Sequence, residues 1–500
     1  MGSVTANLPV LIVAVVLIAS YLMPLFARYR RDWCAPTAAG ALVAAFAGSA
    51  ALAARAVTGE VVIVHLGGWS PPWGIEVAVD ALTAFMLLVL TGVAMLILVY
   101  TISDIGHELA ARAVGWYYTS FLLLVAAMLG MAMARDLFNL YVFIEVSSIG
   151  ACALVASRDT EEATEAAFKY LMLAALGSGL VLFSIGLLYQ VTGNLNFAFV
   201  AEELTLVYGR YPHVIWVAMC FMVVGFAVKA ALFPLHVWLP DAHSFAPSPS
   251  SAVLSGLVIK IYAYAMLRLL YTVFGTQFLG ADLAASLIRV TLLTLATLSI
   301  IGGSLFALVQ VDVKRMLAYS SVAQIGYVFL GVGLATPSGL AAALIHVLNH
   351  ALIKACLFLA AGAIIYRTGK RRTVDLAGMG RRMPVTMAAF TIGALAMIGL
   401  PLFNGFVSKW LLFVGGMQAR QPVVAGVIIL SALLNALYYL PIIWRAYFTP
   451  GPEQEESQVE VPLPMLIPIG VLALACILFG VWPAPALALV NQAVATLVPW

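Results

Sequence analysis

The sequence predicts an all-α, polytopic integral membrane protein, and its composition and its long apolar runs support this prediction. Of the 500 residues, 64% are hydrophobic and only 9% are charged, whereas soluble domains are usually about 45–50% apolar and about 25% charged. Apolar runs long enough for a helix to cross a bilayer recur from Leu8 to Val490. Runs of this length exclude the short alternating pattern of barrel strands. We therefore expect a helical bundle in a single membrane domain, residues 1–500.

Proline, glycine and charge clusters divide the apolar runs into about fourteen predicted spans. The first has no basic segment or clear cleavage site, so we interpret it as a helix rather than a removed signal peptide. The predicted limits are 8–27, 35–57, 78–100, 115–134, 137–157, 168–192, 213–233, 250–273, 288–309, 319–335, 339–366, 386–418, 423–447 and 465–483.

Two spans are interrupted at comparable places, which predicts an internal repeat. In the seventh span Lys229 is followed by Pro234, and in the twelfth Pro401 comes shortly before Lys409. Proline breaks a helix because it lacks an N–H and its ring clashes with the preceding turn. Broken helices in both halves are typical of two inverted five-helix repeats around a transport path. The predicted parts are an N-terminal three-helix segment (1–110), the repeats 111–275 (helices 4–8) and 285–448 (helices 9–13), and a C-terminal helix (460–500).

Lys and Arg concentrate in the loops after odd-numbered spans, including Arg28, Arg31 and the cluster from Arg367 to Arg382. Because positively charged loops stay in the cytoplasm, both termini are predicted to lie on the non-cytoplasmic side. The formal net charge of +3 is small and no basic patch is interleaved with aromatic residues. We therefore expect no nucleic-acid partner.

Ionisable side chains lie at the predicted depth of the membrane. Each one costs about 2.5–3.5 kcal/mol at the centre of an inserted helix, so it needs a partner, a wet cavity or a task. We refer to this set as the polar axis, and its members are Glu145, Lys229, Lys260, His346, His350, Lys354 and Lys409.

In the first half, Glu145 and Lys229 are the nearest opposite charges at similar depth. A buried pair has coupled protonation, because the loss of one charge leaves the other unpaired, and this makes the pair a candidate switch. Lys260 has no local carboxylate, and a lysine in such a setting can load and release a proton.

His346, His350 and Lys354 are spaced i, i+4 and i+8, which puts them on one helix face as a candidate proton relay. Simpler interpretations exist for each residue alone. A lysine near a helix end, such as Lys260 or Lys409, can snorkel to the interface. A lone membrane histidine can be an ordinary hydrogen-bonding residue. The combination of all these residues in one chain favours the relay.

Two polar segments are less informative. Residues 231–252 are too polar and proline-rich to span, so His236, Asp241 and His243 either line the mouth of a pathway or cap helix ends. Residues 310–321 are predicted to form a solvated loop.

The five cysteines are scattered singly, and no nucleotide, haem or zinc motif is present. We therefore expect no cofactor, no metal and no catalytic centre within this chain.

Several motifs resemble those of the antiporter-like subunits shared by Mrp-type Na⁺/H⁺ antiporters, respiratory complex I (NADH:quinone oxidoreductase) and membrane-bound hydrogenases. The resemblance covers roughly residues 80 to 450, and the segments RDLFNLYVFIEVSS and VTGNLNFA are most similar to the D-type Mrp subunit. The matching stretches are RDLFNLYVFIEVSS, AVKAALFPLHVWLPDAH, QVDVKRMLAYSSVAQIGY, HVLNHALIKACLFLAAG and GLPLFNGFVSKWLLF.

This resemblance implies a fourteen-helix fold with broken helices 7 and 12. By position, Glu145 and Lys229 match the family's helix-five glutamate and helix-seven lysine, and Lys260 the residue that links the two half-channels. The three residues of the helix face match the family's relay, and Lys409 matches the residue of its exit path.

The expected function is that of a proton-translocating subunit of a Mrp-type Na⁺/proton antiporter in a prokaryotic cell (inner) membrane. The alternative is a proton-pumping membrane-arm subunit of NADH:quinone oxidoreductase or a membrane-bound hydrogenase, where the redox enzyme's chemistry resides in other subunits. A structural scaffold is a third interpretation. The expected partners are other membrane subunits, including further antiporter-like ones, the lipid bilayer, protons, and Na⁺ by way of the complex.

Overall fold

The computed structural model describes residues 7–280, 283–451 and 458–497, and most of these residues are helical. The first half contains α2 (Leu8–Tyr29), α3 (Cys34–Val57), β1 (Val62–His65), β2 (Glu76–Val79), α4 (Ala81–Glu108), α5 (Val114–Met133), α6 (Leu137–Val155), α7 (Glu161–Thr192), α8 (Phe197–Val207), α9 (Pro212–Lys229), α10 (Trp238–Phe245), α11 (Ser248–Val253), the π-helical η4 (Leu254–Val258) and α12 (Ile259–Thr272). The second half contains α13 (Gly275–Leu279), α14 (Leu283–Leu308), α15 (Val313–Leu334), α16 (Pro337–Thr368), α17 (Met379–Arg382), α18 (Pro384–Ile398), α19 (Asn404–Gln418), α20 (Val423–Phe448), α21 (Leu463–Val481) and α22 (Ala484–Leu497).

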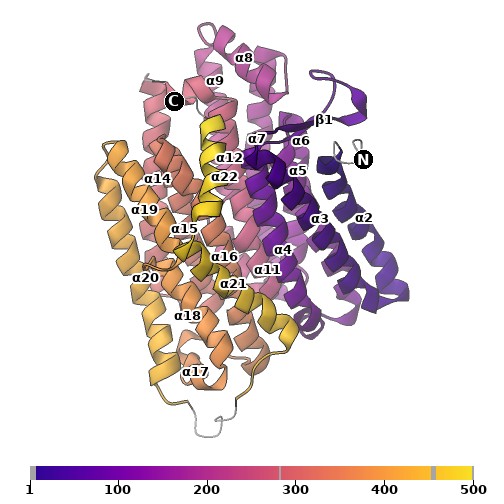
Figure 1. Ribbon diagram of the computed structural model, residues 1–500, viewed down its shortest axis with the longest axis vertical. Helices are drawn as coiled ribbons and strands as arrows, with labels where there is room; N and C mark the ends of the chain where they lie inside the picture. The colour runs from indigo at the N-terminus through magenta and orange to yellow at the C-terminus, as the bar shows by residue number, and fades with distance from the viewer. Residues whose placement is uncertain (1–6, 281–282, 452–457, 498–500) are drawn as a thin grey trace.

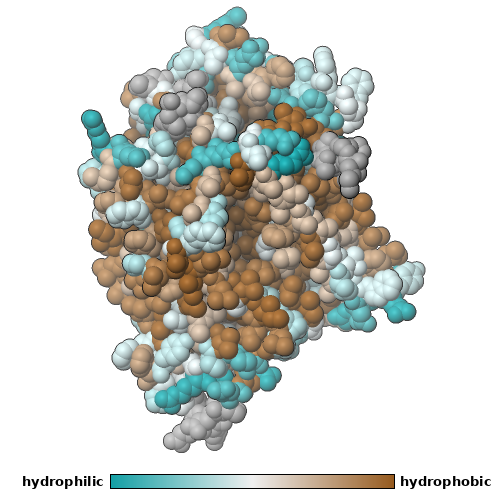
Figure 2. Space-filling view, viewed as in Figure 1, coloured by the Kyte–Doolittle hydropathy of each residue, from teal (hydrophilic) through white to brown (hydrophobic). Residues whose placement is uncertain are grey.

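Within the described residues, 13 helices are long and apolar enough to cross a membrane. Most run along the long axis of the molecule (Figure 1). A broad apolar belt surrounds the middle of the face shown in Figure 2, and hydrophilic residues gather at both ends. The predicted helical membrane bundle is confirmed.

The broken spans are confirmed, and several boundaries differ from the prediction. The predicted span 386–418 is two short helices, α18 and α19, and the seventh helix stops at Lys229 before α10 begins. α4 continues to Glu108, beyond the predicted limit at residue 100, because the polar residues of its last turns are covered by neighbouring helices. A further helix, α22, follows α21 where a single C-terminal helix was predicted.

The two halves share a local anatomy. In four pairs of positions, one from each half, the two members are separated by the same number of residues and have the same structural role. The pairs are the N-caps Asp136 and Asp312, the N-caps Thr160 and Thr336, the left-handed C-caps Gly193 and Gly369, and the backbone bridge partners Asn196 and Arg372. The equivalent segments point in opposite directions, because α8 follows α7 at one end of the molecule and α17 follows α16 at the other (Figure 1). This arrangement supports the predicted inverted repeats.

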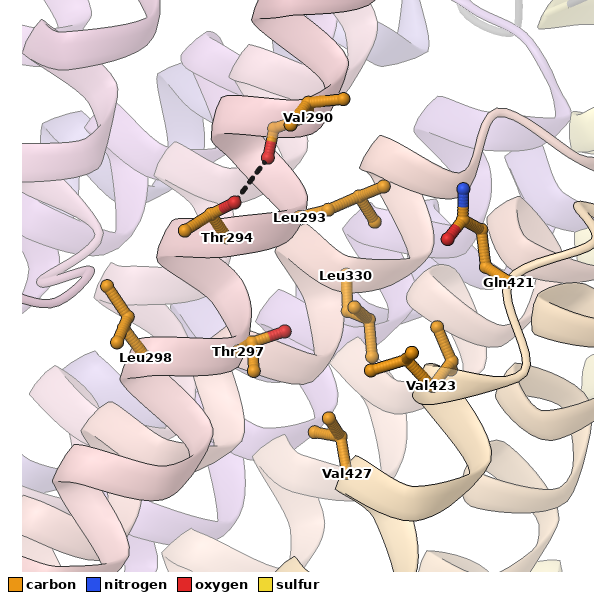
Figure 3. A pocket seen from close by; sticks show the side chains of 10 residues that line it. Val290, Leu293, Thr294, Thr297, Leu298, Leu330, Gln421, Val423 and Val427 are labelled. Atoms are coloured by element: carbon orange, nitrogen blue, oxygen red, sulfur yellow. Dashed lines mark hydrogen bonds between the residues drawn. The ribbon is translucent and has the colours of Figure 1, made fainter.

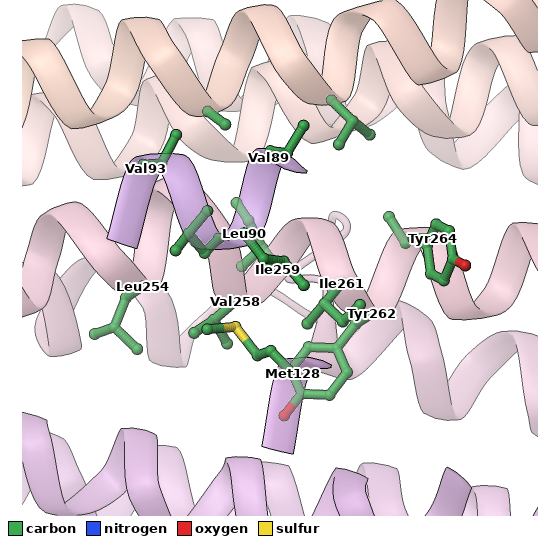
Figure 4. Packing of buried hydrophobic residues seen from close by; sticks show 14 of the residues in the cluster. Val89, Leu90, Val93, Met128, Leu254, Val258, Ile259, Ile261, Tyr262 and Tyr264 are labelled. Carbon is green, nitrogen blue, oxygen red and sulfur yellow. The ribbon is translucent and has the colours of Figure 1, made fainter. Parts of the chain in front are cut away.

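The centre of the bundle is formed by α11, η4, α12, α15 and α16, whose membrane-length segments are almost completely buried. Side chains of α4, α5 and η4 pack around the start of α12, where Val258, Ile259 and Ile261 meet Val89 and Leu90 (Figure 4). In contrast, α2, α7, α14 and α20 bury less than half of their apolar segments. The exposed apolar faces of these outer helices would contact lipid.

A buried ionic cluster ties α4 to α12 outside the polar axis. Asp80 caps α4, and its Oδ1 accepts hydrogen bonds from the Thr83 N–H and hydroxyl, both at 2.8 Å. Its Oδ2 accepts from Arg268 of α12 at 2.5 Å and from Arg135 at 2.6 Å. Burial would raise the pKa of Asp80, but the two guanidinium groups hold it well below its usual range.

Candidate functional site

Lys229 lies at the first helix break and is fixed to the neighbouring helix α6. Its buried ammonium donates a hydrogen bond to Ser148 Oγ at 2.5 Å and lies 5.6 Å from the centre of the Tyr262 ring. Glu145 is half-buried about one helical turn before Ser148. Both residues are described, and they form no direct ion pair, although the Glu145 carboxylate acts electrostatically on Lys229. The predicted pair is therefore close but separated, with the Ser148 hydroxyl holding the amine.

Lys260 connects the two halves through serine residues. It is fully buried at the start of α12, directly after the π-helical η4, and its ammonium donates to the Ser255 carbonyl. π-Helical turns are rare and frequently occur at functional sites. The Ser255 hydroxyl lies 2.7 Å from Ser321 Oγ of α15. This contact joins the segment around Lys260 to the second half, and the role of Lys260 as a link between the repeats remains a prediction.

The predicted helix face on α16 is present. The rings of His346 and His350 are stacked with centres 5.7 Å apart. His346 Nδ1 lies 2.9 Å from Ser408 Oγ of α19, and Lys354 donates to the Ser320 hydroxyl of α15. Between them, His350 is fully buried and neither ring nitrogen has a hydrogen-bond partner in the described part of the chain. The His350 ring thus lies between two hydrogen-bonded side chains of the same face without a hydrogen bond of its own among the described residues.

Lys409 lies beside the second helix break. Its Nζ donates to the carbonyls of Met397 and Ile398, at 2.8 and 2.9 Å, at the C-terminal end of α18. A helix C-terminus attracts a cation because its last carbonyls lack intrahelical partners. Gly399 follows with φ +90°, and a Cβ there would lie 2.7 Å from Lys409 Cδ. Glycine at this position therefore leaves the space that the lysine occupies.

The three residues of the polar segment 231–252 have different environments. Asp241 accepts a hydrogen bond from Lys169 at 3.1 Å near the surface, which fits the mouth of a pathway. His236 is buried among aromatic rings. His243 is completely buried, and in the described chain neither of its ring nitrogens has a hydrogen-bond partner. The charge of Lys354 acts on His243, so this histidine lies inside the protein near the polar axis rather than at its mouth.

Hydroxyl groups accompany the polar axis, and the sequence interpretation did not find them. In the first half, Ser148 binds Lys229 and lies 3.4 Å from the Tyr262 hydroxyl. In the second half, Ser320 binds Lys354 and lies 3.0 Å from the Tyr439 hydroxyl. Each half thus presents a lysine, a serine and a tyrosine in contact. Serines within otherwise apolar membrane helices are the signal that could have indicated them.

The interpretation of residues 310–321 as a solvated loop is wrong for Lys314. α15 begins at Val313, and Lys314 is buried in its first turn, where it donates to the Ala246 carbonyl at 2.6 Å. Near it lie the acidic residues Asp104 and Glu108 from the last turns of α4. The charged ends of α4 and α15 looked like loops in the sequence because their burial depends on distant segments.

The described residues contain no group of three or more His, Cys, Asp or Glu side chains placed to hold a metal ion. One pocket opens between α14 and α20 and is lined mainly by valine, leucine and threonine (Figure 3). No titratable side chain lines it.

A bundle of membrane-length helices around a row of buried ionisable side chains defines an integral membrane protein of the ion-translocating class. Residues 134–435 match the family described as "NADH:quinone oxidoreductase/Mrp antiporter, TM", and the chain belongs to this family.

Known proteins resemble the chain over nearly its whole length. It is 38% identical over 518 residues to NADH-quinone oxidoreductase subunit N of Desulforudis audaxviator, covering 99% of both proteins. It is 30% identical to the Staphylococcus aureus protein named "Putative antiporter subunit mnhD2", covering 84% of this chain and 82% of that protein. Its fold matches a chain of the archaeal membrane-bound sulfane sulfur reductase complex with a TM-score of 0.91, at 32% identity and with 98% and 97% coverage. The chain is therefore an antiporter-like membrane subunit of the kind found in Mrp and complex I-like complexes.

Proposed function

We propose that this chain conducts protons along the polar axis as one subunit of a multi-subunit membrane complex. The observation that carries the proposal is the burial of amines and imidazoles from both repeats, each next to a hydroxyl, a carbonyl or another titratable group. Lys229, Lys354 and Lys409 all have oxygen acceptors at hydrogen-bond distance. A side chain that changes its protonation state can release its acceptor and pass the proton onward through water.

The switch in this proposal is the Glu145–Lys229 pair. Ser148 holds the amine about one turn away from the carboxylate. When the amine and the carboxylate are both charged they attract each other, and the loss of either charge leaves the other uncompensated inside the bundle. The position of the Lys229 amine between Ser148 and Glu145 then changes with proton occupancy, and this change is transmitted to Lys260 and the α16 face.

Reconstituted vesicles test this proposal. K229A and E145A are expected to abolish proton flux driven by the parent complex while the complex still assembles. K370A is the matched control, because Lys370 lies in the loop after α16 and outside the polar axis. Wild-type flux in K229A or E145A, at wild-type assembly, would refute the switch.

The proposal also concerns the kind of complex that contains this chain. The sequence favoured a Mrp-type antiporter, and the likeness to mnhD2 supports it. The likeness to subunit N of NADH-quinone oxidoreductase supports a redox-driven complex instead. Purification of the intact complex separates the two: small antiporter subunits would identify a Na⁺/proton antiporter, and iron–sulfur or flavin subunits a redox-driven pump.

We further propose that the end bearing α17 faces the cytoplasm and that both termini face away from it. The basic cluster from Arg367 to Arg382 lies near α17, whereas both chain ends lie toward the other end of the molecule (Figure 1). Reporter fusions to the C-terminus and to the loop after α16 test this orientation. Equal accessibility of both sites from the cytoplasm would contradict it.

A further inference from the structure

Asp104 is a buried carboxyl group that the polar axis does not use. It lies in the next-to-last turn of α4 with no exposed surface, and neither carboxyl oxygen has a hydrogen-bond partner among the described residues. An ionised carboxylate without any donor is strongly unfavourable inside a protein. A proton on one oxygen, or a bound water, must therefore satisfy Asp104.

Glu108, one turn further along α4, has the opposite environment. Its Oε2 accepts from Arg158, and its Oε1 accepts from Ser248 Oγ at 2.9 Å and from the Ser248 N–H at 3.2 Å. Both carboxyl oxygens of Glu108 thus have hydrogen-bond donors, unlike those of Asp104. The partly exposed Arg158 places this carboxylate next to the aqueous phase. Two carboxyl groups with such different surroundings suit the roles of acceptor and carrier of one proton.

The neighbourhood of Asp104 is tightly packed and polar. The Tyr100 hydroxyl has no hydrogen-bond partner among the described residues. It lies close to Ser248, because a Cβ added at Gly362 of α16 would be 2.8 Å from Tyr100 Oη and 2.9 Å from Ser248 Oγ. The charged and titratable groups that act on Asp104 or lie with it are Tyr100 and Glu108 of α4, Tyr117 and Tyr118 of α5, Arg158 before α7, and Lys314 of α15.

Lys314 connects the Asp104 cluster to the segment that follows His243. The Lys314 ammonium is bonded to the Ala246 carbonyl, in the segment between α10 and α11 that follows His243. The charges of Lys314, Lys354 and Lys260 all act on His243, whose two ring nitrogens have no partner in the described chain. The His243 ring stacks on Phe358 of α16 with centres 4.9 Å apart, and the Lys354 ammonium lies 5.9 Å from the centre of the same Phe358 ring. The segment that contains His243 therefore contacts both Lys314 and the α16 face.

We propose that Asp104 and Glu108 form the proton-uptake site of this chain at the end that bears the basic loops. The proposal rests on the proton conduction proposed above and adds the place where the proton is taken up. A proton from water reaches the rim at Glu108 and is held on an Asp104 carboxyl oxygen. It then moves through water toward the polar axis and leaves the Asp104 carboxylate behind. A second proton from the aqueous phase restores the Asp104 carboxyl.

The test uses the intact complex in proteoliposomes, with D104N and D104E in the chain and D159N as the matched control. Asp159 is an exposed aspartate that pairs with Arg112 at the surface of the same end. D104N is expected to assemble and to lower proton flux at least about tenfold, because a positioned proton carrier is lost. D104E is expected to restore part of the flux with a displaced pH profile. D159N is expected to match the wild type.

Infrared difference spectroscopy supplies a readout that does not depend on transport. The wild-type complex is expected to show a protonated carboxyl band that D104N lacks and D159N keeps. An unchanged band in D104N, wild-type flux in assembled D104N, or an undisplaced pH profile in D104E would each overturn the proposal. If K229A conducts normally while the band is still lost in D104N, the conduction along the polar axis is refuted and the proton-binding assignment of Asp104 stands.

Discussion

Replacing Asp80 with asparagine should destabilise the chain strongly, because the change removes a negative charge that contacts two guanidinium groups. Asp80 Oδ2 lies 2.5 Å from Arg268 and 2.6 Å from Arg135, and the Arg268 side chain is 3% exposed. Removal of one partner from a buried ion pair costs about 3–5 kcal/mol, since the remaining charge is left without compensation. The asparagine can still cap α4 through its side-chain oxygen. The expected loss is therefore electrostatic rather than a loss of helix capping.

The free energy of unfolding in mixed micelles, measured by denaturant titration, tests this value. R268M alone should cost less, about 1.5–3 kcal/mol, because Asp80 keeps Arg135 and Thr83. The double variant D80N/R268M should be more stable than the sum of the two single effects predicts, by up to about 3 kcal/mol. A loss below about 1 kcal/mol in D80N, or strict additivity, would refute the account.

The same cluster makes the stability of the folded chain depend on pH. Because the pKa of Asp80 is lower in the folded chain than in the unfolded chain, its ionised form stabilises the fold at every pH above the unfolded value of about 3.9. This stabilisation is lost as the pH falls from the pKa of Asp80 in the unfolded chain toward its pKa in the folded chain. The stability difference between the wild type and D80N should therefore stay constant from pH 5 to pH 8 and shrink below about pH 4.

Three further changes test the polar axis in the same vesicle assay. G399A should reduce flux severely without preventing assembly, since φ is +90° and the new Cβ would lie 2.7 Å from Lys409 Cδ; flux equal to the wild type would show that the lysine position is unimportant. S148A should lower flux by removing the acceptor of Lys229, and S148T should restore it; failure of the threonine to rescue would contradict the role of the hydroxyl. H350Q should assemble normally, because His350 has no hydrogen-bond partner to lose within the described chain, yet it should block the relay, and undiminished flux would exclude His350 from the path.

The features that the sequence predicted well are those carried by local patterns. Span positions followed from apolar runs, the two helix breaks from Pro234 and Pro401, and the shared face of His346 and Lys354 from helical spacing. Each of these depends on residues within a few turns of one another. Local patterning is therefore sufficient for the bundle and for the helix positions of its ionisable groups.

The features that the sequence missed depend on contacts between distant segments. Ser148 hydrogen-bonds both the Ile144 carbonyl of its own helix and Lys229 far along the chain, and only the first bond follows from local geometry. Lys314 and Asp104 lie in charged helix ends that resemble loops, and their burial requires the packing of α4, α11, α15 and α16 against one another. A single sequence contains no record of such packing.

The types of residue along the path favour protons over metal cations. Sodium and other hard cations are bound by several oxygen ligands, chiefly carboxylates and carbonyls. The polar axis offers Glu145 as its carboxylate, and its other members are lysines and histidines whose nitrogen atoms exchange protons but repel cations when charged. Asp104 and Glu108 supply two further carboxyl groups, but Arg158 and Lys314 lie beside them and oppose the binding of a cation. We therefore expect a complex that couples Na⁺ to this chain to carry Na⁺ through another subunit, and we propose that the charge state of the lysines transmits the coupling.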